Sequence, residues 1–221
     1  MTLGVLGGTF DPIHLGHLAA ADAAQQALSL ESILLIPSRI PPHRADPVTA
    51  GTEDRLAMAR LAAAERPGWS ASRLELDREG RSYTYDTLIE IQEGMSEGSQ
   101  IFFITGADAF AEIASWSRYP AVLDLAHFVV VSRPGITLDS LRERVPSAFD
   151  RPLDSARGKL RSAKTRVILV EANTPDISST DIRRRVRAGE SLTGYVPVSV
   201  ADYIRDQGLY LGPQKAQKAQ N

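Results

Sequence analysis

The sequence of 221 residues lacks cysteine. Disulfide bonds, thiolate metal sites and cysteine nucleophiles are therefore excluded, and the absence fits a reducing cytoplasm. Neither sign of charge is in excess, because 25 lysines and arginines stand against 27 aspartates and glutamates. A surface for nucleic acid is not indicated, so any phosphate site must be local. No apolar run is long enough to span a bilayer, and no basic segment leads into an apolar one near the N-terminus, so we expect no membrane partner.

Short apolar runs alternate along the chain with segments rich in helix-forming residues. The predicted strands are 3–6, 32–37, 69–76, 101–105, 128–131 and 167–170, and the predicted helices include 18–28, 52–65, 81–94 and 198–206. This alternation is typical of parallel strands joined by right-handed crossovers. We therefore predict an α/β fold: a Rossmann-like, doubly wound, mainly parallel sheet with helices on both faces. The order of the strands cannot be read from the sequence.

The length favours a single domain, which we place at residues 1–210. Residues 136–165 are charged and weakly patterned, and they predict a surface insertion. Residues 211–221 carry a Lys-Ala-Gln repeat and predict a disordered tail.

The stretch from Gly7 to His17 reads Gly-Gly-Thr-Phe-Asp-Pro-Ile-His-Leu-Gly-His. It joins a predicted strand to a predicted helix through a glycine turn. At such a junction glycines let the backbone approach phosphate groups, and the helix N-terminus offers N–H groups and the positive end of a dipole. The spacing matches neither the dinucleotide-binding glycine pattern nor the P-loop. The turn therefore predicts a phosphate site of another type.

His14 and His17 lie three residues apart at the start of that helix, so they share one face. Two imidazoles beside a glycine turn suit an anion whose charge increases during reaction, such as a pentacoordinate phosphorus. The alternative is part of a metal site, for which Asp11 is the candidate third ligand. The preceding glycines favour phosphate.

This first motif resembles the signature of the nucleotidyltransferase superfamily that carries a T/H-x-G-H motif. The resemblance implies attack on the α-phosphate of a nucleoside triphosphate, with release of pyrophosphate. The implied ATP-binding residues are Gly7, Gly8, Thr9, Phe10, His14 and His17, and the two histidines are also implied to be catalytic. An acceptor that is a phosphate monoester has a second pKa of about 6 and needs no general base. Catalysis would then rest on positioning and electrostatics.

A second motif, Ile-Ser-Ser-Thr-Asp-Ile-Arg, spans Ile177 to Arg183. It is typical of a helix N-terminus with hydroxyl groups and an arginine one turn in, which can hold the β- and γ-phosphates. The alternative is an ordinary Ser/Thr cap on a solvated basic helix. Beside the first motif, the segment resembles the superfamily's second motif. That resemblance implies that Ile177, Ser178, Ser179, Thr180 and Arg183 bind ATP and that Arg183 is also catalytic.

Gly106 and Asp108 follow the predicted strand 101–105. A carboxylate at this edge can accept hydrogen bonds from ribose hydroxyls, although a helix cap is the alternative. The run Thr-Gly-Ala-Asp-Ala-Phe resembles the family's contact with the ATP ribose, which favours ATP binding by both residues.

Two further residues suggest a site for the acceptor. Thr84 enters a predicted helix whose first N–H groups can hold a small carboxylate, unless Thr84 is only a helix cap. Trp116 can stack on a flat cationic ring, unless it packs in the core. A pyridinium carboxylate satisfies both residues.

Taken in order, the motifs are similar to those of bacterial nicotinate-nucleotide adenylyltransferases from about residue 1 to 210. The resemblance implies that ATP and nicotinate mononucleotide give deamido-NAD and pyrophosphate, a step of NAD biosynthesis. It also implies Mg²⁺ held mainly by the ATP phosphates, because no acidic metal cage stands out in the sequence. The implied acceptor-binding residues are Pro42, His43, Arg44, Thr84, Tyr85, Trp116 and Arg133.

Three alternatives stay open at this point. The acceptor could instead be nicotinamide mononucleotide or phosphopantetheine, since no sequence rule separates a carboxylate from a carboxamide. From another class, the chain could be a nucleotide-binding module without turnover. The oligomeric state is not readable, and a homo-oligomer remains open.

Overall fold

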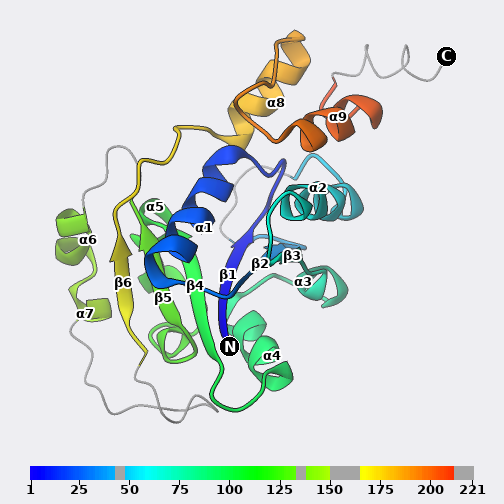
Figure 1. Cartoon of the computed structure of the whole chain (residues 1–221). Coiled ribbons are helices and arrows are strands. Elements are labelled where there is room, and N and C mark those ends of the chain that lie inside the picture. The colour runs from blue at the N-terminus through cyan, green and yellow to red at the C-terminus, as the bar shows by residue number, and fades with distance from the viewer. Residues whose placement is uncertain (43–47, 133–137, 150–164, 212–221) are drawn as a thin grey trace.

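The computed structural model describes residues 1–42, 48–132, 138–149 and 165–211. Within these ranges six strands form one parallel sheet in the order β3-β2-β1-β4-β5-β6 (Figure 1). The strands are β1 Thr2–Gly8, β2 Ser32–Pro37, β3 Trp69–Ala71, β4 Gln100–Gly106, β5 His127–Val131 and β6 Val167–Val170. This is the strand order of the doubly wound dinucleotide-binding sheet, so the predicted fold class is confirmed.

Helices cover both faces of the sheet. They are α1 Leu15–Leu28, α2 Thr52–Ala64, α3 Leu74–Asp77, α4 Thr84–Gly94, α5 Ala107–Phe110, α6 Leu138–Arg144, α7 Pro146–Phe149, α8 Ser179–Ala188 and α9 Val198–Asp206, with 3-10 turns η1 Ile113–Ser115 and η2 Ala121–Asp124. Successive strand residues point to opposite faces. Leu6 and Ile104 therefore join the core beneath α1, α2, α8 and α9, whereas Val5 and Phe103 join the core beneath α4 and η2.

The strand order reverses between β1 and β4. The connection after β1 leads to β2 on one side, and the connection after β4 leads to β5 on the other. Because these connections diverge, a crevice opens beyond the carboxyl ends of the two strands, which is where open α/β sheets bind ligands. In Figure 1, β1 begins near the label N, and α8 and α9 lie at the opposite end of the molecule.

One prediction about local structure is wrong. The strand predicted over 69–76 ends at Ala71, and Leu74–Asp77 forms the short helix α3 instead. In the described part of the predicted surface insertion 136–165, α6 and α7 bury Leu141 and Ala148 in the core.

Two further parts of the domain prediction lie outside the described residues. These are residues 136–137 and 150–164 of the insertion and residues 212–221 of the tail. The predicted helix 198–206 and the predicted strands 32–37 and 167–170 have the bounds expected from the sequence.

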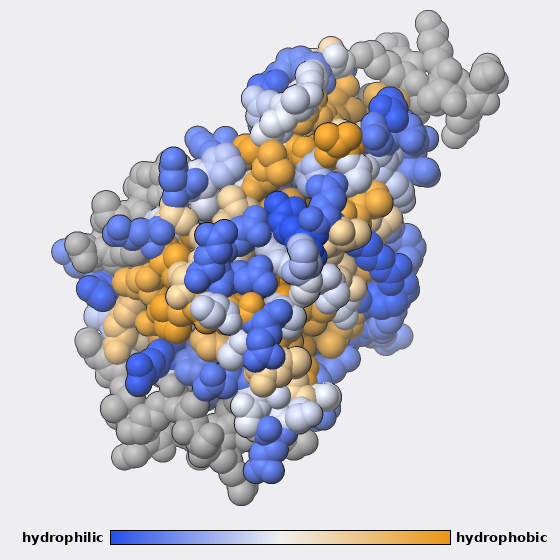
Figure 2. All heavy atoms as spheres, viewed as in Figure 1, coloured by the Kyte–Doolittle hydropathy of each residue, from blue (hydrophilic) through white to orange (hydrophobic). Residues whose placement is uncertain are grey.

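The surface seen in Figure 2 mixes hydrophilic residues with smaller hydrophobic areas, as expected from a net charge of −2 with both signs well represented. Within the described ranges, none of the helices combines the length and the apolar character needed to cross a membrane.

Candidate active site

A cavity of about 540 Å³ lies at the crevice between β1 and β4. This volume is in the usual range for sites that enclose small molecules. Gly7 and Gly8 come from the end of β1, and Thr105 and Gly106 come from the end of β4. The predicted ATP-binding residues that line the cavity are Gly7, Gly8, Thr9, His14, His17, Gly106, Asp108, Ile177, Ser178 and Ser179. The two motifs, which are far apart in the sequence, therefore meet at one cavity.

The glycine turn is shaped by Phe10, whose ring is buried beneath it. A Cβ atom on Gly8 would lie 2.7 Å from Cε1 of Phe10, so only glycine fits at this position. Phe10 itself has a left-handed φ of 50° and is 1% exposed. Its ring packs edge-on against His17, with centroids 5.1 Å apart. Phe10 was predicted to bind ATP, but its side chain does not line the cavity and instead supports the turn and His17.

The two histidines cap the helix on which they lie. The backbone N–H of His17 donates to Nδ1 of His14 (3.3 Å), and the backbone N–H of His14 donates to Nδ1 of His17 (3.2 Å). The rings stack with centroids 3.6 Å apart. A Cβ atom on Gly16 would lie 3.1 Å from the His14 ring and 3.3 Å from the Pro175 carbonyl oxygen, which explains the glycine between the histidines.

These caps determine which ring nitrogen can donate. Because each Nδ1 accepts a backbone hydrogen bond, the proton of each neutral ring is on Nε2. His14 and His17 both line the cavity at the positive end of the α1 dipole. Two similarly oriented rings with Nε2–H donors therefore lie at the N-terminus of α1, where the helix dipole favours anions.

Asp11 anchors the turn from below. Its side chain is fully buried, and its carboxylate accepts hydrogen bonds from the backbone N–H groups of Thr49 and Ala50, both at 2.9 Å. The metal alternative required Asp11 as a third ligand beside the histidines. In the structure this carboxylate is instead hydrogen-bonded to backbone N–H groups. The described residues contain no group of three or more acidic or histidine side chains suited to a metal ion.

Arg183 lies behind the turn rather than in the cavity. Its guanidinium is buried and donates to the Asp11 carbonyl oxygen (2.8 Å) and to the Thr180 hydroxyl (3.0 Å). It also lies 3.7 Å from the Asp11 carboxylate. Neither Arg183 nor Thr180 lines the cavity; the Arg183 side chain holds the turn, and its predicted contact with phosphate stays a prediction.

The hydroxyl groups at the start of α8 also make internal hydrogen bonds. Ser178 is the N-cap and accepts from the backbone N–H of Asp181 (3.1 Å). Ser179 donates to the Pro12 carbonyl oxygen (2.9 Å), which ties α8 to the first motif. The cap alternative is therefore confirmed for Ser178. Both serines still line the cavity, so the N-terminus of α8 is presented to it.

Asp108 lies in the first turn of α5, exposed and lining the cavity. The N-cap of this helix is Gly106, so the cap alternative for Asp108 is wrong. Its predicted contact with the ribose stays a prediction, which its position permits.

The predicted acceptor residues divide into three groups. Pro42, Thr84 and Trp116 line the cavity. Tyr85 does not, and its ring is covered by the Arg118 guanidinium at 5.2 Å. His43, Arg44 and Arg133 lie outside the described residues.

The positions of Thr84 and Trp116 bear on whether Thr84 is only a helix cap and whether Trp116 only packs in the core. Thr84 is the first residue of α4, whose N-cap is Tyr83, and no side chain caps the helix. The N-terminus of α4 is thus open to a ligand carboxylate. Trp116 is half-buried, with its ring against Phe103 at 6.0 Å and Phe128 at 6.4 Å, while it also lines the cavity. Core packing is therefore confirmed for Trp116, and its predicted stacking on a ligand ring stays a prediction, which its place in the cavity wall permits.

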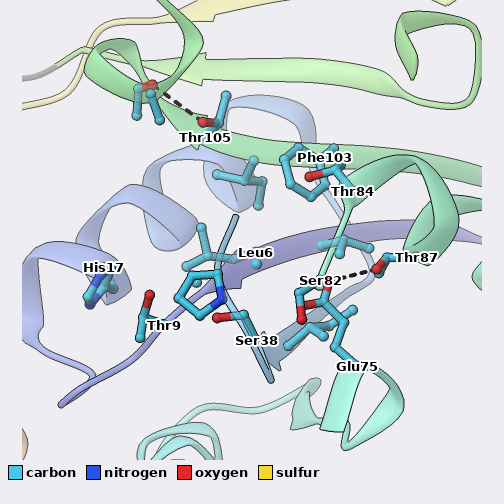
Figure 3. Close-up of a pocket in the computed structure, with 18 of the residues that line it drawn as sticks. Leu6, Thr9, His17, Ser38, Glu75, Ser82, Thr84, Thr87, Phe103 and Thr105 are labelled. Carbon is cyan, nitrogen blue, oxygen red and sulfur yellow. Dashed lines mark hydrogen bonds between the residues drawn. The ribbon is translucent and has the colours of Figure 1, made fainter. Parts of the chain in front are cut away.

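Glu75, a carboxylate buried in the cavity wall, is not predicted from the sequence. It accepts a 2.6 Å hydrogen bond from the Thr87 hydroxyl, and burial raises its pKa above the ordinary value for glutamate. In the close-up of Figure 3, Glu75 lies with Ser82 and Thr87 on the side of the cavity opposite His17. Glu75 lies in the short helix α3, where the sequence predicted a strand.

Arg55 was also missed. It is 1% exposed, and its guanidinium donates to the carbonyl oxygens of Thr9 (2.8 Å), Ser38 (2.6 Å) and Ala50 (3.3 Å). It therefore holds the ends of β1 and β2 together under the cavity. A signal was present in the sequence, because Arg55 shares a helix face with the apolar Ala59 and Ala62.

Comparisons with known proteins agree with this geometry. Residues 5–185 match the model of the family described as cytidylyltransferase-like. A protein of Moorella thermoacetica, named a probable nicotinate-nucleotide adenylyltransferase, is 40% identical over 208 residues, which cover 94% of this chain and 91% of the relative. An equally named protein of Aeromonas salmonicida is 44% identical over 209 residues, which cover 94% of this chain and 96% of the relative.

Among solved structures, the nicotinic acid mononucleotide adenylyltransferase of Plasmodium falciparum complexed with NaAD is similar. The TM-score is 0.72 at 19% identity, with 95% of this chain and 97% of that chain covered. A structure from Vibrio parahaemolyticus has a TM-score of 0.60 at 19% identity, with 95% of this chain and 94% of that chain covered. At this identity the likeness shows a shared fold.

Proposed function

Because the chain belongs to the cytidylyltransferase-like family, we propose that it transfers the adenylyl group of ATP to nicotinate mononucleotide, giving deamido-NAD and pyrophosphate. One observation carries the proposal. A single cavity joins two stacked histidines at a helix N-terminus to a second, uncapped helix N-terminus beside a tryptophan. The first part suits a reacting phosphate, and the second suits a flat ring that bears a carboxylate.

The reaction needs little covalent chemistry from the protein. An oxygen of the acceptor phosphate attacks the α-phosphorus of ATP, a new P–O bond forms, and the bond to the bridging oxygen of the β-phosphate breaks. The electron pair leaves with pyrophosphate. The acceptor phosphate is mostly ionised near neutral pH, so no general base is required. The Nε2–H groups of His14 and His17 stabilise the charge that builds up on the α-phosphate oxygens.

The same geometry orients both substrates. The N-termini of α1 and α8 attract the triphosphate, and Asp108 accepts hydrogen bonds from the ATP ribose. The N-terminus of α4 at Thr84 binds the pyridine carboxylate, while Trp116 stacks on the pyridinium ring. Alignment of the two phosphates in one cavity supplies much of the rate.

The proposal places Mg²⁺ on the ATP phosphates. The carboxylates among the described lining residues are those of Glu75 and Asp108, and no cluster of three ligands is found in the described ranges. When bound, Mg²⁺ neutralises phosphate charge. We also propose a cytoplasmic location, in keeping with the lack of cysteine. A homo-oligomer is a separate proposal, and sedimentation of the purified chain would distinguish it from a monomer.

The test is pyrophosphate release from the purified protein with ATP and Mg²⁺. Nicotinate mononucleotide, nicotinamide mononucleotide and phosphopantetheine are offered in parallel, and a His14→Ala/His17→Ala variant purified in the same way controls for contaminating enzymes. We expect strong preference for nicotinate mononucleotide. Preference for another acceptor would overturn the assignment of Thr84 and Trp116, and ATP binding without release would favour a nucleotide-binding module.

A further inference from the structure

Ser38 follows directly after β2 and lines the cavity. The residue is 6% exposed, and its Oγ has no hydrogen-bond partner among the described residues. Its backbone is held in place, because its N–H donates to the Gly8 carbonyl oxygen (2.9 Å) and its own carbonyl oxygen accepts from Arg55 (2.6 Å). Ser38 is thus fixed at the cavity wall, and its hydroxyl has no hydrogen-bond partner among the described residues.

This state is unusual for a buried polar group. Folding removes the Ser38 hydroxyl from bulk water, and the described residues give it nothing in return. The nearby Ser82 behaves differently: it is 7% exposed, lines the same cavity, and its Oγ accepts from the backbone N–H of Arg39 (2.8 Å). The Thr87 hydroxyl is likewise bonded to Glu75. A ligand oxygen would supply the hydrogen-bond partner that the Ser38 hydroxyl lacks among the described residues.

The position of Ser38 indicates which part of the ligand this is. In the view of Figure 3, Ser38 lies between Thr9 and His17 on one side and Ser82 and Glu75 on the other. The reacting phosphate belongs to the first side and the acceptor ring to the second. The part of the acceptor that joins them is its ribose 5′-phosphate.

We propose that the Ser38 hydroxyl binds an oxygen of the acceptor's ribose 5′-phosphate, and so helps to hold the acceptor for attack. This inference rests on the proposed function. It predicts that Ser38 contributes to the affinity for the acceptor and nothing to the stability of the unliganded protein.

The test compares Ser38→Ala with the matched control Ser82→Ala. Ser38→Ala should raise the KM for nicotinate mononucleotide about 10- to 100-fold, the effect of one hydrogen bond to a charged group. The KM for ATP should change less than about 2-fold, and the melting temperature should stay the same or rise. Ser82→Ala should lower the melting temperature, because its hydroxyl has a protein partner. Ser38→Cys keeps the shape of the side chain but hydrogen-bonds weakly, and it should reproduce the KM change.

Each outcome decides the inference. An unchanged acceptor KM, a larger rise in the ATP KM, or a lower melting temperature in Ser38→Ala would overturn it. The wild-type arm tests the proposed function separately. If the wild type does not use nicotinate mononucleotide, the proposed function fails. If the wild type does but Ser38→Ala matches it, only the assignment of Ser38 fails.

Discussion

His17 combines two roles that substitutions can separate. Its Nδ1 accepts the backbone N–H of His14 and so closes the cap of α1, while its ring lines the cavity. His17→Ala removes both. Loss of a cap acceptor costs roughly 1 kcal/mol of stability. Loss of a donor to the charge that develops in the transition state lowers kcat by about 10² to 10³. ATP affinity should change by about 2- to 3-fold at most, since the helix N-termini and the triphosphate remain.

His17→Gln distinguishes these two roles. His17 is the third residue of α1, and glutamine at this position is the usual partner in a capping box, where its side chain reaches back to the N-cap N–H. The variant should therefore recover the stability that His17→Ala loses. It places no ring against Phe10 or His14, so its amide NH₂ group is not held toward the reacting phosphate as the His17 ring is. We expect the stability of the wild type with the low kcat of the alanine variant.

The measurements are thermal unfolding, single-turnover rates of pyrophosphate release and ATP affinity by calorimetry. They are made on wild type, His17→Ala and His17→Gln under identical conditions. A His17→Ala variant with the wild-type rate would refute a transition-state role. Recovery of both stability and rate in His17→Gln would show that His17 acts only as a cap.

Three further predictions concern other parts of the cavity. Trp116→Ala should raise the acceptor KM by more than the ATP KM in steady-state assays, because the ring lines the cavity near Thr84; equal changes would mean that Trp116 serves only the core. Burial raises the pKa of Glu75, so the folded protein holds this proton more tightly than the unfolded chain, and stability falls as pH rises through the interval between the two pKa values. Glu75→Gln should therefore have a higher melting temperature than the wild type at about pH 8, with the difference shrinking towards about pH 4; a difference independent of pH would contradict this. Arg183→Met removes a buried cation that lies 3.7 Å from the Asp11 carboxylate and donates to the Asp11 carbonyl oxygen, and it should cost about 3–5 kcal/mol in denaturant unfolding, together with loss of turnover; turnover lost at unchanged stability would instead return Arg183 to direct contact with phosphate.

The sequence by itself determined the features that depend on neighbouring residues. Continuous apolar runs predicted β2 and β6 with their observed bounds, as is typical of parallel strands; β2 is mostly buried, whereas β6, at the edge of the sheet, is half-buried. The glycines before His14 and His17 indicated a phosphate site, since the turn and the helix N-terminus are made within one short stretch. The order of the motifs along the chain resembles that of the family, and this order can be read without knowing the fold.

Only the tertiary structure decided which distant groups meet. Arg183 donates to the Asp11 carbonyl oxygen across 172 residues of sequence, and the residues around either one do not predict this contact. The strand order placed the ends of β1 and β4 beside each other and so created the cavity. Folding buries Glu75 in the cavity wall and leaves the Ser38 hydroxyl without a partner among the described residues. These properties depend on what surrounds a polar group after folding, and a buried polar group is stabilised or left unsatisfied by partners that come from anywhere in the chain.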